Sequence, residues 1–149
     1  MTLARHCDLE DMSDAQTYPS AVVALPIADR RRSCGFYTGV LGLEPVGTPG
    51  SDGIPEPLML RVNDGFRLVL VPTGGFGSVI GERDVASEGV AECLLRVEQE
   101  SQEAVREIVG RARAAGAHVV SEPEQRPWGF EGIFADPDGH LWVVAVAGD

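Results

Sequence analysis

The sequence contains no lysine. All 12 basic residues are arginine, they face 23 aspartates and glutamates, and the formal net charge at pH 7 is −11. Because contacts to nucleic-acid phosphates need a basic surface, this balance predicts no nucleic-acid partner. The excess of negative charge favours the approach of a cationic or neutral ligand, or it serves solubility alone.

Cysteine is scarce, and long apolar runs are absent. The three cysteines, Cys7, Cys34 and Cys93, are odd in number and lack CxxC spacing, which argues against a disulfide framework or a zinc knuckle. No apolar run approaches the roughly 20 residues that span a bilayer. The acidic N-terminus also lacks the features of a secretory signal. We therefore expect a cytoplasmic protein without membrane contact.

The length of 149 residues suits one compact domain. Residues 1–17 show no hydrophobic periodicity and carry four acids, so they are predicted to form a mobile acidic arm. Residues 18–149 are predicted to form a single domain of two modules, 18–73 and 89–149. The glycine-rich segment 74–88 between them is predicted to be a linker loop.

The sequence pattern of the first module predicts the element order β-α-β-β-β. Asp29 stands where a helix N-cap is expected, Gly42 where the helix should stop, and Asn63-Asp64-Gly65 is a strong hairpin signal. The predicted elements are a strand over 20–29, a helix over 30–42, a short strand over 43–47 and a hairpin over 57–72.

The same order then repeats. Ser101 can cap the second helix, and Gly116 ends it. Each unit has a helix to cover one sheet face, so two remaining free faces brought together would enclose a ligand cleft. The predicted elements are a strand over 90–99, a helix over 102–116, a short strand over 117–121 and a hairpin over 129–146.

Two stretches, "LPIADRRRSCGFYTGVLGLE" and "GIFADPDGHLWVV", carry a family resemblance. Between about residues 20 and 147 the chain resembles the vicinal oxygen chelate superfamily, which includes glyoxalase I, extradiol dioxygenases and bleomycin-resistance proteins. The resemblance implies an α+β fold of two paired βαβββ modules, whose curved mixed sheets surround a cavity. It also implies a homodimer, which many relatives form.

Metal-dependent relatives hold a divalent ion with His, Gln or Glu from the first and last strand of each module. The first-strand ligand stands about seven residues before the Asp that opens the helix. That position is Val22 before Asp29 in the first module and Glu92 before Gln99, which aligns with Asp29, in the second. The last-strand ligand stands about five residues after the turn Asp, which gives Val69 and Val143. Valine offers no ligand atom, and divalent ions need several. We therefore expect no metal and no other cofactor, which is nearest to the metal-free bleomycin-resistance type.

Strand alternation predicts which side chains line the cavity. Glu92 could pair with Arg67 or Arg96, contact the ligand, or act as a general acid or base. Trp128, Phe130 and Met59 could contact a ligand or belong to the core. His140 is expected to serve the turn or the sheet edge. The predicted ligand-binding residues are Val22, Met59, Arg67, Val69, Glu92, Arg96, Trp128, Phe130, Leu141 and Val143.

The leading hypothesis is a metal-free protein that sequesters a small aromatic or cationic natural product, as in antibiotic self-resistance. A metal-dependent lyase, isomerase or dioxygenase is an alternative, as is a metal-independent enzyme that uses Glu92. A structural or regulatory protein with a vestigial cavity is the fourth possibility.

Overall fold

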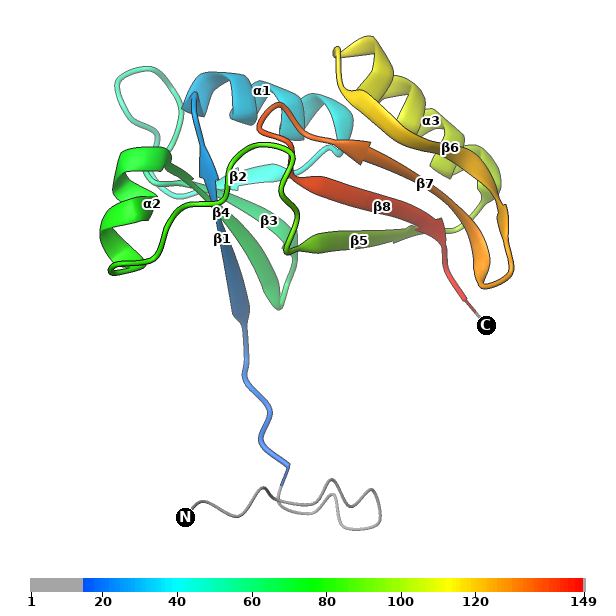
Figure 1. Cartoon of the computed structure of the whole chain (residues 1–149), viewed down its shortest axis with the longest axis horizontal. Coiled ribbons are helices and arrows are strands. Elements are labelled where there is room, and N and C mark those ends of the chain that lie inside the picture. Colours follow the sequence, from blue (N-terminus) through cyan, green and yellow to red (C-terminus); the bar gives the residue numbers. More distant parts are fainter. Residues whose placement is uncertain (1–14, 149) are drawn as a thin grey trace.

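The computed structural model describes residues 15–148 and contains two sheets and three helices (Figure 1). The predicted arm lies outside the described residues, except for residues 15–17, which are exposed and have no regular structure. The elements are β1 (Ala21–Ile27), α1 (Arg30–Val40), β2 (Glu44–Val46), β3 (Leu58–Asn63), β4 (Phe66–Pro72), α2 (Thr73–Val79), β5 (Leu94–Gln99), α3 (Gln102–Ala114), β6 (His118–Arg126), β7 (Gly129–Ala135) and β8 (Leu141–Val146).

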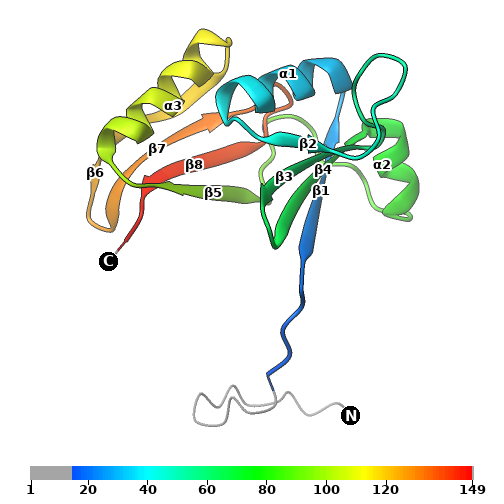
Figure 2. The same ribbon diagram turned by 180° about the vertical axis from the view of Figure 1, so that it is seen from behind.

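The two sheets have equivalent topologies. The strand orders are β1-β4-β3-β2 and β5-β8-β7-β6. In each sheet one neighbouring pair is parallel, β1 with β4 and β5 with β8, and the other pairs are antiparallel. Helices α1 and α3 lie on the same side of the molecule, as both views of the ribbon show (Figures 1 and 2). The predicted α+β fold of two βαβββ modules is confirmed.

Both module helices begin where the sequence predicts. Asp29 Oδ1 accepts hydrogen bonds from the backbone N–H groups of Arg31 and Arg32, and Ser101 Oγ accepts one from Ala104. These bonds satisfy donors that the first turn of a helix leaves free. At the far end of α3, Gly116 has φ of 88°, a left-handed conformation that glycine adopts without strain.

A buried polar cluster joins the two modules. The hydroxyl of Tyr37 in α1 donates to Asp136 Oδ2 and accepts a 3.0 Å hydrogen bond from the indole N–H of Trp142 in β8. Asp136 Oδ1 accepts from the backbone N–H groups of Asp138 and His140. Burial raises the pKa of Asp136, against the opposing effect of the Tyr37 hydrogen bond. Helix α1 is thereby fixed against the second module.

The structure corrects three boundaries. Residues 74–79, predicted as part of the linker loop, belong to the helix α2, which packs on β1 and β4 and is tied to Ile27 O by the hydroxyl of its first residue, Thr73. Strand β5 begins at Leu94 rather than at residue 90, because its partner β8 begins at Leu141, opposite Leu94. Strand β6 continues to Arg126 instead of ending at residue 121. Its Pro123 lies where the pairing of β6 with β7 is irregular. Because β6 is an edge strand, the missing backbone N–H of this proline is tolerated.

No helix among residues 15–148 has the length and apolar character required to cross a membrane.

Candidate functional site

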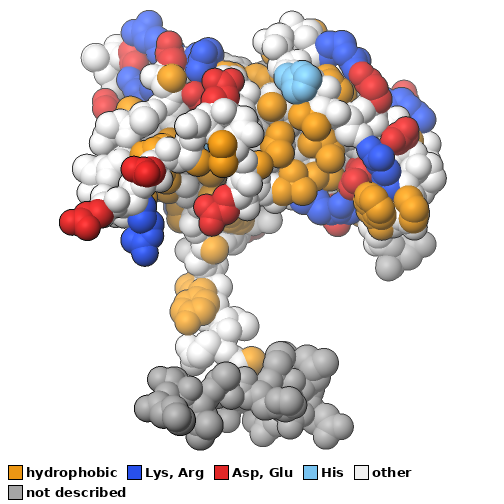
Figure 3. All heavy atoms as spheres, in the orientation of Figure 1, with side chains coloured by type: hydrophobic (Ala, Val, Ile, Leu, Met, Phe, Trp, Pro, Cys, Tyr) orange, Lys and Arg blue, Asp and Glu red, His pale blue; other side chains and the backbone are white. Residues whose placement is uncertain are grey.

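The face of the second sheet that points away from α3, here called the open face, is largely apolar. Leu95 and Val97 of β5 pack into the core under α3, so the alternate residues Leu94 and Arg96 lie on the open face. They pair in register with Leu141 and Val143 of β8. Hydrophobic side chains gather here, framed by charged ones (Figure 3).

The core side of the same strands follows the predicted alternation. Trp142 and Val144 of β8 are completely buried, and Val146 packs against the core. In the first module, Leu68 and Leu70 of β4 are completely buried as well. The register that the sequence predicts for the last strands is therefore confirmed.

A polar trio stands on the open face. Glu131 of β7 is 6% exposed, and its Oε1 accepts a 2.9 Å hydrogen bond from the indole N–H of Trp128. Its Oε2 lies 3.4 Å from one terminal guanidinium nitrogen of Arg96, and the Nε of Arg96 lies 3.6 Å from a carboxylate oxygen of Glu98. Trp128 is 69% exposed although its indole N–H is held. An exposed aromatic ring is thus fixed beside an apolar surface.

The structure changes which residues correspond between the modules. Helix α1 is capped by Asp29 and α3 by Ser101, and the position seven residues before each cap is Val22 and Leu94. Val22 pairs with Arg67, and Leu94 pairs with Leu141, at corresponding places on the two parallel strand pairs. The prediction that Glu92 is the counterpart of Val22 is therefore wrong, because Glu92 lies two residues before β5 begins.

The donor set does not fit the divalent ion that metal-dependent relatives hold. With Leu94 in place of Glu92, the four corresponding positions are Val22, Val69, Leu94 and Val143, and all of them are aliphatic. Hydrocarbon side chains offer no oxygen, nitrogen or thiolate to a metal. Within residues 15–148, moreover, no group of three or more His, Cys, Asp or Glu side chains is placed to hold a metal ion.

Four of the predicted site residues come together on the equivalent face of the first sheet. Val22 pairs with Arg67 across β1 and β4, and Met59 pairs with Val69 across β3 and β4. A guanidinium nitrogen of Arg67 lies 3.9 Å from the Met59 sulfur. Val22 is 51% exposed.

Phe130 is not a cavity residue. It is 6% exposed, belongs to the hydrophobic core, and carries the guanidinium of Arg106 from α3 at 4.8 Å over its ring. Strand alternation then places its neighbour Glu131 on the open face. Sequence reasoning missed Glu131. The signal was available, because a phenylalanine assigned to the core turns the next residue towards the ligand side.

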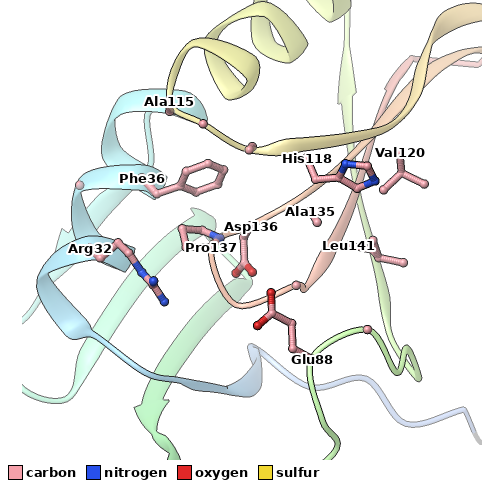
Figure 4. Close-up of a pocket in the computed structure, with 15 residues that line it drawn as sticks. Arg32, Phe36, Glu88, Ala115, His118, Val120, Ala135, Asp136, Pro137 and Leu141 are labelled. Carbon is pink, nitrogen blue, oxygen red and sulfur yellow. The ribbon is translucent and has the colours of Figure 1, made fainter.

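Two hollows lie beside the open face. The first, about 760 Å³, is bounded by α1, the start of β6 and the β7–β8 turn, with Arg32, Phe36, Glu88 and His118 among its walls (Figure 4). Asp136 borders this hollow too, but its carboxylate already accepts hydrogen bonds from the Tyr37 hydroxyl and from the backbone N–H groups of Asp138 and His140.

The second hollow, about 600 Å³, lies between β1, α2 and the segment that leads into β5. Glu92 lines this hollow. His140 is nearby, and its Nε2 lies 2.6 Å from Pro26 O, so it links the turn to β1. The ion pairs foreseen between Glu92 and either Arg67 or Arg96 do not occur within the described part of the chain; Arg96 pairs with Glu131 and Glu98 instead.

Solved structures share this fold. A glyoxalase-related enzyme from Fulvimarina pelagi is 28% identical with a TM-score of 0.73, over 85% of this chain and 86% of that one. A hypothetical protein from S. aureus is 20% identical with a TM-score of 0.75, over 92% of this chain and 100% of that one. An antibiotic binding protein from Streptomyces sp. CB03234 is 23% identical with a TM-score of 0.58, over 90% and 98%.

No curated protein matches the chain. The model of one protein family does match, over residues 20–144, which is most of the sequence and runs from the start of the first module into β8 of the second. The chain belongs to the Glyoxalase/Bleomycin resistance protein/Dioxygenase superfamily.

Proposed function

We propose that this protein binds a small aromatic or cationic natural product without a metal and without altering it. One observation carries the proposal: the four positions at which metal-dependent relatives place their ligands are Val22, Val69, Leu94 and Val143. Catalysis in the metal-dependent relatives depends on those donors. Four aliphatic side chains supply an apolar wall in their place.

The composition of the open face supports small-molecule binding. Leu94, Leu141 and Val143 form an apolar strip, and Arg96 and Glu131 supply a few polar points beside it. Small-molecule sites commonly combine a mainly apolar lining with a few polar groups that orient the ligand. Among solved structures with this fold is an antibiotic binding protein, which agrees with the proposal at the level of the fold.

The proposal includes a homodimer. Within one chain the modules pack together through α1 and α3, and each ligand-side face keeps an exposed apolar residue, Val22 at 51% and Leu94 at 56%. Exposed apolar patches of this kind commonly mark an interaction site. In our proposal the first sheet of one subunit covers the open face of the other, and twofold symmetry makes two equal cavities. The cytoplasmic location and the lack of a nucleic-acid partner remain predictions.

The test is a binding screen against planar aromatic and cationic natural products, with daunorubicin and bleomycin among them. We expect stoichiometric binding that quenches tryptophan fluorescence and raises the melting temperature, with the compound recovered unchanged by mass spectrometry. Leu94→Glu should abolish binding, because it places a charge in the apolar strip. Val79→Glu, at a 76% exposed position on α2, is the matched control.

Turnover of a bound compound would contradict the proposal, and so would a panel that gives neither quenching nor a thermal shift. If Leu94→Glu and Val79→Glu lost binding equally, the loss would come from the added charge and not from the apolar strip, and this result would also contradict the proposal.

A further inference from the structure

We propose that the ligand-side face of the first sheet binds an anionic group of the ligand, such as a carboxylate, through the neighbouring arginines Arg61 and Arg67. This inference rests on the proposed function and specifies its ligand class: an aromatic compound that also carries an acidic group. It starts from the register of β3 and β4, in which Arg61 and Arg67 stand directly opposite each other.

Both arginines lie on the ligand-side face. Leu60 of β3 and Leu68 of β4 are completely buried in the core, so strand alternation turns Arg61 and Arg67 to the opposite face. On its other side Arg67 pairs with Val22 of β1, one of the four positions at which metal-dependent relatives place their ligands. The arginine pair therefore stands beside the apolar wall of the proposed cavity.

The fold does not require arginine at these two positions. In the second sheet, which has the same topology, the corresponding residues are Ala135 of β7 and Leu141 of β8, and they pair with each other. Leu141 pairs in turn with Leu94, as Arg67 pairs with Val22. The same place in the fold thus holds two apolar side chains in one module and two cations in the other.

Two facing cations are unfavourable unless an anion lies between them. Like charges directly opposite each other on neighbouring strands destabilise a sheet. Within the described residues neither Arg61 nor Arg67 forms an ion pair, and a guanidinium nitrogen of Arg67 lies 3.9 Å from the Met59 sulfur. Glu44 of β2 pairs in register with Arg61 on the side away from Arg67, and it can neutralise at most one of the two charges. At least one positive charge on this face is therefore left for an anion.

Two adjacent guanidinium groups match an oxyanion. Each presents its N–H donors in a planar fork that binds carboxylate oxygens in pairs. The neighbouring side chains Val22, Val69 and Met59 are apolar and suit the ring system of an aromatic acid. The net charge of the whole chain, −11, opposes anions at long range, so an anion binds only where such local donors hold it.

Three probes with the same ring system test the selection: anthracene carboxylate, the neutral anthracene carboxamide and the aminomethylanthracene cation. We expect the carboxylate to bind about tenfold more tightly than the carboxamide at low ionic strength, which is the scale of a charge-assisted hydrogen bond. The difference should shrink as salt is added. The net charge of the chain alone predicts the reverse order, with the cation bound most tightly.

Arg61→Gln and Arg67→Gln separate recognition from structure. Each should weaken binding of the carboxylate about tenfold and change the affinity for the carboxamide by less than about twofold. Because each substitution removes a repulsion between facing cations, the melting temperature should not fall, whereas a structural role for the pair would lower it. Arg31→Gln, which removes a guanidinium from a 74% exposed side chain on α1, is the matched control and should leave both affinities unchanged.

A carboxylate that binds no better than the carboxamide, or equal loss of both probes in the two glutamine variants, would overturn this inference. The proposed function would still stand if a compound of the natural-product panel bound. Conversion of a wild-type dimer into monomers by Arg61→Gln or Arg67→Gln would also overturn the inference, because carboxylates of a second subunit would then occupy the arginine pair. If neither these probes nor any compound of the panel bound, the proposed function would fail and this inference with it.

Discussion

Tyr37→Phe tests the packing that holds the two modules together. The tyrosine hydroxyl is completely buried, donates to Asp136 and accepts from Trp142. Its removal leaves a buried carboxylate oxygen without this donor and a buried indole N–H without an acceptor. Each unsatisfied buried group costs about 1–3 kcal/mol. We therefore expect the free energy of unfolding to fall by about 3 kcal/mol, and the melting temperature by roughly 6–12 °C for a chain of this size.

The assay is urea unfolding, followed by circular dichroism, of the wild type and the variant. Tyr18→Phe, at a position 78% exposed, removes a hydroxyl without burial and should leave stability unchanged. The Tyr37 hydrogen bond favours the ionised form of Asp136, so it lowers the pKa of that carboxyl. The loss in Tyr37→Phe should therefore be largest at neutral pH and shrink as acid protonates Asp136. A loss below about 1 kcal/mol at neutral pH would refute the reasoning.

Three further predictions follow from the described contacts. Burial raises the pKa of Asp136, whereas the Ile54 backbone N–H and the Arg30 guanidinium lower that of Asp52. As pH rises through the acidic range, the wild type should lose stability relative to Asp136→Asn and gain it relative to Asp52→Asn, in urea titrations at each pH. Gly132→Ala should destabilise by about 1–3 kcal/mol, because an added Cβ would stand 3.0 Å from a Val109 methyl, whereas Gly110→Ala in open space on α3 should be neutral or stabilising in the same assay. Light scattering should give a mass near twice 15.9 kDa for the wild type and the single-chain mass for Leu94→Glu, and a wild-type monomer would contradict the dimer.

The fold was predictable because its signals are local and repeated. Asp29 and Ser101 cap the helices, and the alternation along β8 places Trp142 and Val144 in the core. Helix α2 was missed because its three glycines disfavour a helix, so its formation depends on packing against β1 and β4.

The site was predictable only in part, because aligning the modules requires knowing where each helix begins. Matching Gln99 instead of Ser101 to Asp29 displaced the first-strand position from Leu94 to Glu92. Glu131 was missed for a different reason. Its importance comes from Trp128 and Arg96, which lie 3 and 35 residues away and meet it only in the folded sheet.

The central claim is that the cavity binds its ligand through an apolar wall at positions where relatives bind a metal. The direct test measures ligand affinity together with metal content, on protein purified without chelator. Whichever compound of the panel binds is titrated with excess EDTA and again after loading with Zn²⁺, Mn²⁺ or Fe²⁺. We predict the same affinity in every titration and a metal-to-protein ratio near zero. A ratio near one, with binding that EDTA abolishes and a divalent ion restores, would contradict the account.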